Sequence, residues 1–333
     1  MAVAVALLLL TSLYAFVNAF TRSTEIATIA SDSSILLESW ESAEGGSRLT
    51  KKENHGNQPP TGTEPPPDLI LRVRYSQKHQ VIRGFGGALT QASGTLWNKL
   101  KTDALRREVL ESYFGVSGIS ASIARVPINS CDFADASYSA DDVADDEGLA
   151  HFDWELPHDE AQLLPIVRAA LAASPQLELL ASPWSPPAWM KTNNDMNGNG
   201  KPQGLRLEAA AAWAKYISYW LSAFSAHGAN VSMLTVQNEP QAPSPWEACY
   251  YDAAQEAAFI SDHLGPALEA GAKLGRHPPV TLLGFDDQKD QVAAWSEELM
   301  GEGKPAASFV GGIAYHWCAT VRGGVFSNEL AGQ

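Results

Sequence analysis

Short apolar runs alternate with longer segments of helical periodicity through most of this chain, and this alternation limits the folds that it can adopt. Runs that predict strands cover 81–89, 118–128, 177–184, 231–239, 280–287 and 309–317. Segments that predict helices lie between them at 94–114, 159–173, 207–227, 253–273 and 291–300. Nearly continuous apolar strands separated by helices are typical of a parallel sheet covered by helices. The sequence therefore predicts an α/β fold.

Polar and aromatic side chains gather at the carboxyl end of almost every predicted strand. An open doubly wound sheet would also produce the alternation, but these clusters favour a (β/α)8 TIM barrel, whose active site lies at the carboxyl ends of its strands. About sixteen residues follow Trp317, which is too few for a helix and two more strands at about 3.3 Å per strand residue. We therefore expect a barrel that is truncated after its sixth strand.

The fourth predicted strand ends in residues that strand formation does not require. The largely apolar run Val231 to Val236 is followed directly by Gln237, Asn238, Glu239 and Pro240. This position puts the carboxyl group of Glu239 where a barrel keeps its active site. Glu239 is thus our first candidate for a catalytic acid. The alternative is an ordinary strand end with a solvated glutamate.

Other strand ends carry candidates for substrate binding. Arg125 lies within the second predicted strand, where an arginine is costly unless a carboxylate pairs with it. Asp132 follows on the next loop and can accept two sugar hydroxyls, and Trp184 can stack on the apolar face of a sugar ring. The alternative for Trp184, and our expectation for Trp189, is a core position that anchors the loop. His316 has no second His or Cys at metal-ligand spacing, so we interpret it as a hydrogen-bonding partner.

Several short motifs follow one another along the chain in a distinctive order. They are Gly84-Phe85-Gly86-Gly87-Ala88, Arg125-Val126-Pro127, Ser130-Cys131-Asp132-Phe133, Leu180-Ala181-Ser182-Pro183-Trp184-Ser185, Met190-Lys191-Thr192-Asn193, Asn238-Glu239-Pro240, Asp286-Asp287-Gln288 and His316-Trp317. Together they resemble the glucosylceramidases of glycoside hydrolase family 30, from about Leu69 to Trp317. The resemblance implies a TIM barrel with an attached β-domain and a retaining β-glucosidase that hydrolyses glucosylceramide in sphingolipid metabolism.

The same resemblance implies roles for individual residues. It makes Glu239 the acid/base and Asn238 the donor to the sugar 2-hydroxyl. It also implies that Asp132 and Trp184 hold the glucose, with Trp317 nearby. A different family-30 retaining β-glycosidase, acting on β-glucan or xylan, is an alternative function. A non-catalytic remnant that binds sugar or lipid is the alternative outside enzymes.

The second catalytic carboxylate is not evident in this sequence. A retaining glycosidase needs a nucleophile about 5 to 5.5 Å from its acid/base. In the family this residue ends the seventh strand in a Ser/Thr-Glu-Ala type motif, so we expect it beyond Gln333. Glu329 follows Trp317 too closely to reach that position through a helix, and we do not assign it as the nucleophile. The chain as given is therefore expected to lack the nucleophile.

The first 80 residues divide into three segments. The apolar run that begins at Ala2 ends in a small-residue pattern at 17–19, so 1–19 is predicted to be a signal peptide for the secretory pathway, with a lysosomal or extracellular destination. A retained signal anchor is the alternative. Residues 20–68 are rich in Ser, Gly and Pro and are predicted to be disordered or a linker. Residues 69–80 read as a strand of an accessory β-domain, and 81–333 as the incomplete barrel.

Charge and cysteine content narrow the partners. The chain has 23 Lys and Arg against 38 Asp and Glu, a formal net charge of -15, which argues against a nucleic-acid partner. Cys131, Cys249 and Cys318 lie far apart without metal-ligand spacing, so we expect free buried thiols. No motif indicates a metal or an organic cofactor. The predicted partner is glucosylceramide or another β-glucoside, and contact with a membrane surface or an activator protein is left open.

Overall fold

The computed structural model describes residues 39–41, 50–52, 77–242 and 244–316. The chain forms two compact units, Val3–Arg83 and Gly84–Gln333, and each is described by itself. In the first unit, β1 (Ser39–Glu41) and β2 (Thr50–Lys52) pair antiparallel. This pair lies inside the segment predicted to be disordered or a linker, because strands this short leave no periodic signal. The predicted signal peptide and residues 69–76 of the predicted accessory strand lie outside the described residues, and residues 77–80 of that prediction form no strand.

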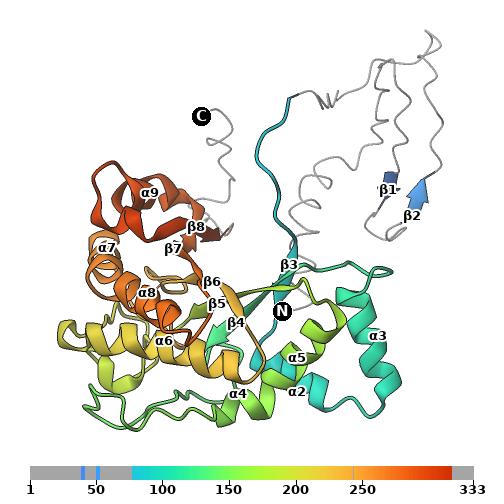
Figure 1. The fold of residues 1–333 in the computed structure, drawn as a ribbon, viewed down its shortest axis with the longest axis horizontal. Coiled ribbons are helices and arrows are strands. Elements are labelled where there is room, and N and C mark those ends of the chain that lie inside the picture. Colours follow the sequence, from blue (N-terminus) through green and yellow to red (C-terminus); the bar gives the residue numbers. More distant parts are fainter. Residues whose placement is uncertain (1–38, 42–49, 53–76, 243, 317–333) are drawn as a thin grey trace. The chain divides into compact units, whose positions relative to one another are not determined.

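The second unit contains a six-stranded parallel sheet (Figure 1). Its strands are β3 (Gly86–Ala88), β4 (Ile123–Ile128), β5 (Glu178–Pro183), β6 (Val231–Thr235), β7 (Thr281–Gln288) and β8 (Val310–His316). The spatial order β3-β4-β5-β6-β7-β8 is also the chain order. A doubly wound sheet reverses direction and gives a non-sequential order, whereas a barrel winds in one direction. The predicted α/β fold and the preference for barrel winding are both confirmed.

Helices connect successive strands and lie outside the sheet (Figure 1). The α-helices are α2 (Gln91–Asn98), α3 (Asp103–Phe114), α4 (Pro157–Gln162), α5 (Leu164–Ala173), α6 (Ala210–Ala226), α7 (Ala253–Phe259), α8 (Gly265–Lys273) and α9 (Val292–Met300). A π-helical turn, η3 (Ile260–Leu264), joins α7 to α8. Short 3-10 turns are η1 (Ala188–Met190), η2 (Leu207–Ala209), η4 (Lys289–Gln291) and η5 (Pro305–Ser308).

Two predicted helices are divided in the structure. The predicted helix 94–114 consists of α2 and α3, because Thr102 is an N-cap whose hydroxyl accepts from the Leu105 N–H and so begins a new helix. The predicted helix 159–173 consists of α4 and α5, which meet at Leu163. At Leu163 the apolar pattern continues through the break, so hydrophobic periodicity alone does not reveal it.

The core lies between the sheet and the helices that cover it. The inward face of α6 is fully buried at Trp213, Tyr216, Trp220 and Phe224. The rings of Trp220 and Phe224 stack with centroids 4.3 Å apart. Truncation of a buried tryptophan to alanine typically costs about 3 to 5 kcal/mol. This aromatic layer therefore supports the strands whose carboxyl ends carry the polar side chains described below.

The close contact of β3 with β4 depends on a glycine. A Cβ atom added at Gly86 would lie 1.5 Å from the carbonyl oxygen of Ile123. No side chain fits at that distance, so any other residue would separate the two strands. The glycine motif that begins the barrel thus has a structural reason at this position.

Two further sequence features can be compared with the structure. Cys131 and Cys249 are free, buried thiols as predicted, while Cys318 lies outside the described residues. Across the described ranges, none of the helices combines the length and apolar character needed to cross a membrane.

Candidate active site

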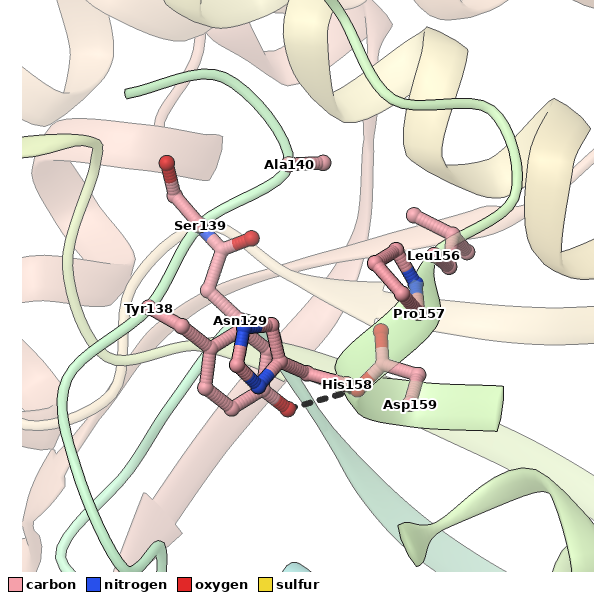
Figure 2. A pocket seen from close by; sticks show the side chains of 8 residues that line it. All are labelled: Asn129, Tyr138, Ser139, Ala140, Leu156, Pro157, His158 and Asp159. Carbon is pink, nitrogen blue, oxygen red and sulfur yellow. Dashed lines mark hydrogen bonds between the residues drawn. The ribbon is translucent and has the colours of Figure 1, made fainter. Parts of the chain in front are cut away.

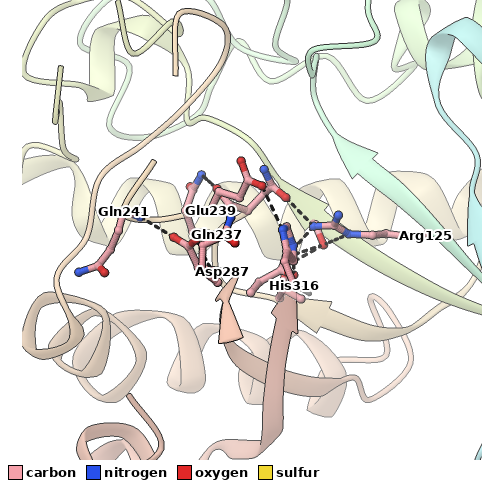
Figure 3. Close-up of polar contacts among 11 residues, drawn as sticks. Arg125, Gln237, Glu239, Gln241, Asp287 and His316 are labelled. Atoms are coloured by element: carbon pink, nitrogen blue, oxygen red, sulfur yellow. Dashed lines mark hydrogen bonds and ion pairs between the residues drawn. The ribbon is translucent and has the colours of Figure 1, made fainter. Parts of the chain in front are cut away.

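Polar side chains from five neighbouring strands meet at the carboxyl edge of the sheet. Arg125 comes from β4, Ser182 from β5, Asp286 from β7 and His316 from β8. The segment after β6 adds Glu239 and its neighbours. Figure 3 shows His316 between Glu239 and Arg125, with dashed contacts that join the three into one network. Parallel strands bring their carboxyl ends together, so residues far apart in sequence form one site.

Arg125 and Asp286 form the centre of this network. The Arg125 Nη2 atom lies 2.6 Å from Asp286 Oδ2, and Arg125 Nε donates to Ser182 Oγ at 2.9 Å. Thr235 Oγ1 donates to the same Asp286 oxygen at 2.8 Å. Burial of the Asp286 carboxyl would raise its pKa, but the charge of Arg125 and a hydrogen bond from His316 hold that pKa below its usual range. Asp286 is therefore a carboxylate that orients the cations on either side of it.

Asn238 is oriented by the same arginine. Arg125 Nη2 donates to Asn238 Oδ1 at 2.8 Å, and the Asn238 backbone N–H donates to the carbonyl oxygen of Pro183 at 2.8 Å. Because a guanidinium only donates, the oxygen of the amide must face it. The Asn238 amide nitrogen is thereby left as the donor that can serve a ligand.

Glu239 occupies a strained backbone position. Its φ of 48° is left-handed, a region that costs a residue with a Cβ about 1 to 2 kcal/mol. Its backbone N–H donates to the carbonyl oxygen of Asp286 at 3.0 Å, and its side chain is 25% exposed. Strain of this kind is concentrated at functional sites. The conformation leaves the carboxyl group accessible at the edge of the sheet.

His316 joins the catalytic candidate to the central carboxylate. Its Nδ1 lies 3.0 Å from Glu239 Oε1, and its Nε2 lies 3.1 Å from Asp286 Oδ1. Burial lowers the pKa of the imidazole, but the hydrogen bonds to Asp286 and Glu239 outweigh that effect and raise the pKa to about 9. At neutral pH His316 is thus a cation that donates from both ring nitrogens. In this structure the ring is a hydrogen-bonding partner of both carboxyl groups.

The predicted sugar-binding residues lie around this network. Asp132 lies on the loop after β4, and the residue as a whole is exposed. Its carboxyl group is nevertheless partly shielded by neighbouring atoms, which is the first cause that raises its pKa, and the negative charge of Glu239 is the second. Trp184 lies beneath the guanidinium of Arg125, which is 4.8 Å from the ring centroid. Trp189 is buried, and its indole N–H donates to the carbonyl oxygen of Asp141 at 2.9 Å, as expected of a loop anchor. Trp317 lies outside the described residues.

Buried side chains hold the chain that follows β4, and Figure 2 shows two of them, Tyr138 and Asp159, joined by a hydrogen bond. The hydroxyl of Tyr138 donates to Asp159 Oδ1 at 2.6 Å and accepts from Gln91 Nε2 at 2.5 Å. The Tyr138 backbone N–H donates to the Ser130 hydroxyl at 3.0 Å. Burial raises the pKa of Asp159 to about 6. These contacts tie residues 130 and 138, on either side of Asp132 in sequence, to each other and to the buried Asp159.

Sequence reasoning did not identify three members of the network as site residues. Ser182 and Asp286 fell within motifs that indicated the family, and Thr235 looked like an ordinary strand residue. Gln237 is fully buried, and its Nε2 donates to the carbonyl oxygens of Trp184 and Asn238 at 2.7 and 2.9 Å. The available signal was a polar side chain at the carboxyl end of a buried strand.

Within the described residues, no cluster of three or more His, Cys, Asp or Glu is arranged to hold a metal.

A glycoside hydrolase presents a pair of carboxyl groups to the bond that it cleaves, and Glu239 places one carboxyl group at the carboxyl ends of the strands, where a barrel keeps its active site. Residues 82–324 match the Glycosyl hydrolase family 30 TIM-barrel domain. The chain belongs to glycoside hydrolase family 30, and its six described parallel strands are part of the barrel of that family.

Relatives of different substrate classes resemble the chain. Lysosomal acid glucosylceramidase of Mus musculus is 35% identical over 257 residues, which are 75% of this chain and 48% of the relative. Endo-1,6-beta-D-glucanase BGN16.3 of Trichoderma harzianum is 29% identical over 256 residues, 74% of this chain and 50% of the relative. The crystal structure of SrfJ from Salmonella typhimurium is 37% identical, with a TM-score of 0.65, and the match covers 72% of this chain and 51% of that one. The chain spans about half the length of the curated relatives it matches.

Proposed function

We propose that this chain carries the acid/base of a retaining β-glycosidase site, and that Glu239 is this residue. The observation that carries the proposal is the contact of Glu239 Oε1 with His316 Nδ1 at 3.0 Å, beside an asparagine that Arg125 orients. His316 occupies one carboxyl oxygen of Glu239, so the other oxygen is the one that faces the glycosidic bond. A general acid must lie within hydrogen-bond reach of the leaving oxygen that it protonates, and it later accepts a proton from water.

The neighbouring residues bind the sugar in this mechanism. The Asn238 amide nitrogen donates to the 2-hydroxyl, a contact that strengthens in the transition state. Asp132 accepts hydroxyls of the glucose, and Trp184 packs against the ring. A second carboxylate, from a segment that follows β8, acts as the nucleophile on the opposite face of the sugar. It forms the glycosyl-enzyme bond as the leaving group departs with the proton from Glu239.

Glucosylceramide is the favoured substrate. Support comes from the motifs around Asn238 and His316 and from the similarity to the mouse lysosomal acid glucosylceramidase. A β-glucan is the second candidate, because the chain is also similar to an endo-1,6-β-glucanase. A third candidate is xylan, because a family-30 xylanase of known structure is also similar to this chain. In each case the chemistry at Glu239 is the same, and the difference lies in the group that leaves.

The test measures hydrolysis of glucosylceramide, β-1,6-glucan and xylan by the full-length protein, with E239Q as the matched control. We expect release of β-configured glucose from glucosylceramide by the wild type, and little release by E239Q. Hydrolysis of glucan or xylan instead would reassign the substrate but keep the role of Glu239. Binding without turnover of any of the three would favour the non-catalytic alternative.

We further propose that residues 1–19 direct the protein into the secretory pathway, toward the lysosome or the cell exterior. The proposal rests on the apolar segment and the small residues at 17–19. Amino-terminal sequencing of the expressed protein should begin near Phe20. An intact Met1 in membrane fractions would indicate a signal anchor instead.

A further inference from the structure

Glu256 is a fully buried carboxylic acid that the proposed reaction does not use. It lies in the first half of α7 and has none of its surface exposed. Its Oε1 accepts a 2.8 Å hydrogen bond from the backbone N–H of Phe285, whereas Oε2 has no hydrogen-bond partner in the described part of the chain. Burial of a carboxyl group is costly. The hydrogen bond from Phe285 is therefore the contact that shows the role of Glu256 in this fold.

That contact lies at the irregular point of β7. Phe285 and Asp286 have φ values of 74° and 64°, so two successive residues with side chains are left-handed. The register of β7 against β8 also shifts between Phe285 and Asp287. Such a bulge turns a side chain in a direction that a regular strand would not allow, and it persists only where neighbouring groups hold it. Here the side chain that is turned belongs to Asp286.

The strand leaves room for the Glu256 carboxyl to reach it. A Cβ atom added at Gly284 would lie 3.3 Å from Glu256 Oε1 and 2.3 Å from Leu299 Cδ1. A side chain at this position would push α7 and α9 away from β7. The glycine thus permits the close approach through which the carboxyl group reaches the N–H of Phe285.

We infer that Glu256 is a positioning residue of this site. By accepting the Phe285 N–H, it holds the bulge of β7 in the conformation in which Asp286 bridges Arg125 and His316. These two cations in turn hold Asn238 and Glu239. The positioning of Asp286 rests on geometry alone, and its consequence for catalysis rests on the proposed function.

The protonation state of Glu256 suggests a matched pair of variants. Burial raises its pKa to about 8, the hydrogen bond from Phe285 opposes this, and the charges of Asp286 and Asp287 add to it. The carboxyl group is therefore mostly neutral at pH 7, and glutamine mimics its shape and its acceptor oxygen. E256Q keeps the acceptor for Phe285. E256M keeps an unbranched side chain of similar length and removes the acceptor.

The primary readout is the pKa of the His316 imidazole, followed by NMR titration of the full-length protein without substrate. We expect the wild type and E256Q to keep the raised pKa, and E256M to show a fall of about one unit or more as Asp286 moves from the ring. If E256M does not fold, E256D, which withdraws the carboxyl by one methylene, should show the same fall. A folded E256M protein whose His316 titrates as in the wild type would overturn the inference, as would loss of the raised pKa in E256Q.

A second readout separates positioning from stability. The concentration of active sites is first measured by covalent titration with a slow sugar substrate, so that kcat is expressed per active site. E256M should then lower kcat about tenfold on glucosides with poor leaving groups and less on activated aryl glucosides. Equal loss on both would contradict a role that acts through Glu239. If the wild type has no glycosidase activity but E256M shows the expected fall in the His316 pKa, the proposed function is rejected. The inference that Glu256 positions Asp286 is then still supported.

Discussion

His316 couples the stability of this protein to pH, because two carboxylates hold its imidazole. Burial disfavours the cation, yet the bonds to Asp286 and Glu239 raise its pKa from 6.5 to about 9. The side chain is only 19% exposed, so solvent weakens these contacts little. Because the pKa of His316 is higher in the folded state, protonation of the ring stabilises the fold. This stabilisation is complete at a pH below 6.5, the pKa in the unfolded chain, and it is lost as the pH rises to about 9, the pKa in the folded state. At about 1.4 kcal/mol per pKa unit, the shift corresponds to about 3 kcal/mol.

We therefore predict that the free energy of unfolding falls by about 3 kcal/mol more in the wild type than in H316Q between pH 6.5 and 9. The assay is urea unfolding at half-unit intervals of pH. Glu256 also makes the free energy of unfolding fall as the pH rises from about 4.5, its ordinary pKa, to about 8, its raised pKa in the folded state. E256Q is the control for that contribution, and it should retain the fall that depends on His316. Parallel curves for the wild type and H316Q would refute the reasoning.

Three further predictions test the surrounding structure. R125K should lose about 1 to 3 kcal/mol in urea unfolding and at least tenfold in kcat, because an ammonium cannot serve Ser182, Asn238 and Asp286 together; wild-type values would contradict the network. N238A should lower kcat/KM on β-glucosides but leave 2-deoxyglucosides almost unchanged, since only the former offer the hydroxyl; equal losses would exclude that contact. W220A should destabilise the protein by about 3 to 5 kcal/mol with KM unchanged, measured by urea unfolding and steady-state kinetics; a changed KM would give this core residue a role in binding.

The order of strands and helices could be predicted from sequence because each burial pattern is local. Apolar runs such as 231–239 and 280–287 show where the strands lie. The helices between them are recognised by apolar residues that recur every three to four positions. Boundaries were less accurate. β3 covers only Gly86–Ala88 of the predicted 81–89, because strand assignment depends on a pairing partner that the sequence does not show.

The sequence predicted which residue types lie at the candidate site, but it did not predict the hydrogen bonds that join them. Glu239, Arg125 and His316 stood out because polar groups are unexpected at buried strand ends. Their network depends on Asp286, whose direction is set by two left-handed residues in β7. Nothing in the local sequence requires a bulge there, since neither Phe285 nor Asp286 is a glycine. The part played by Glu256 was hidden for a similar reason, because its contact with Phe285 spans 29 residues.

Glu239 is proposed to give a proton to the glycosidic oxygen and later to take one from the attacking water, and the dependence of rate on the leaving group tests the first of these steps. The measurement is kcat/KM of the wild type and E239Q on aryl β-glucosides whose phenols span a wide range of acidity. We expect a loss of about 10² to 10⁴-fold for E239Q on poor leaving groups, and this loss should shrink steadily as the phenol becomes more acidic. A loss of the same size across the whole series would contradict it.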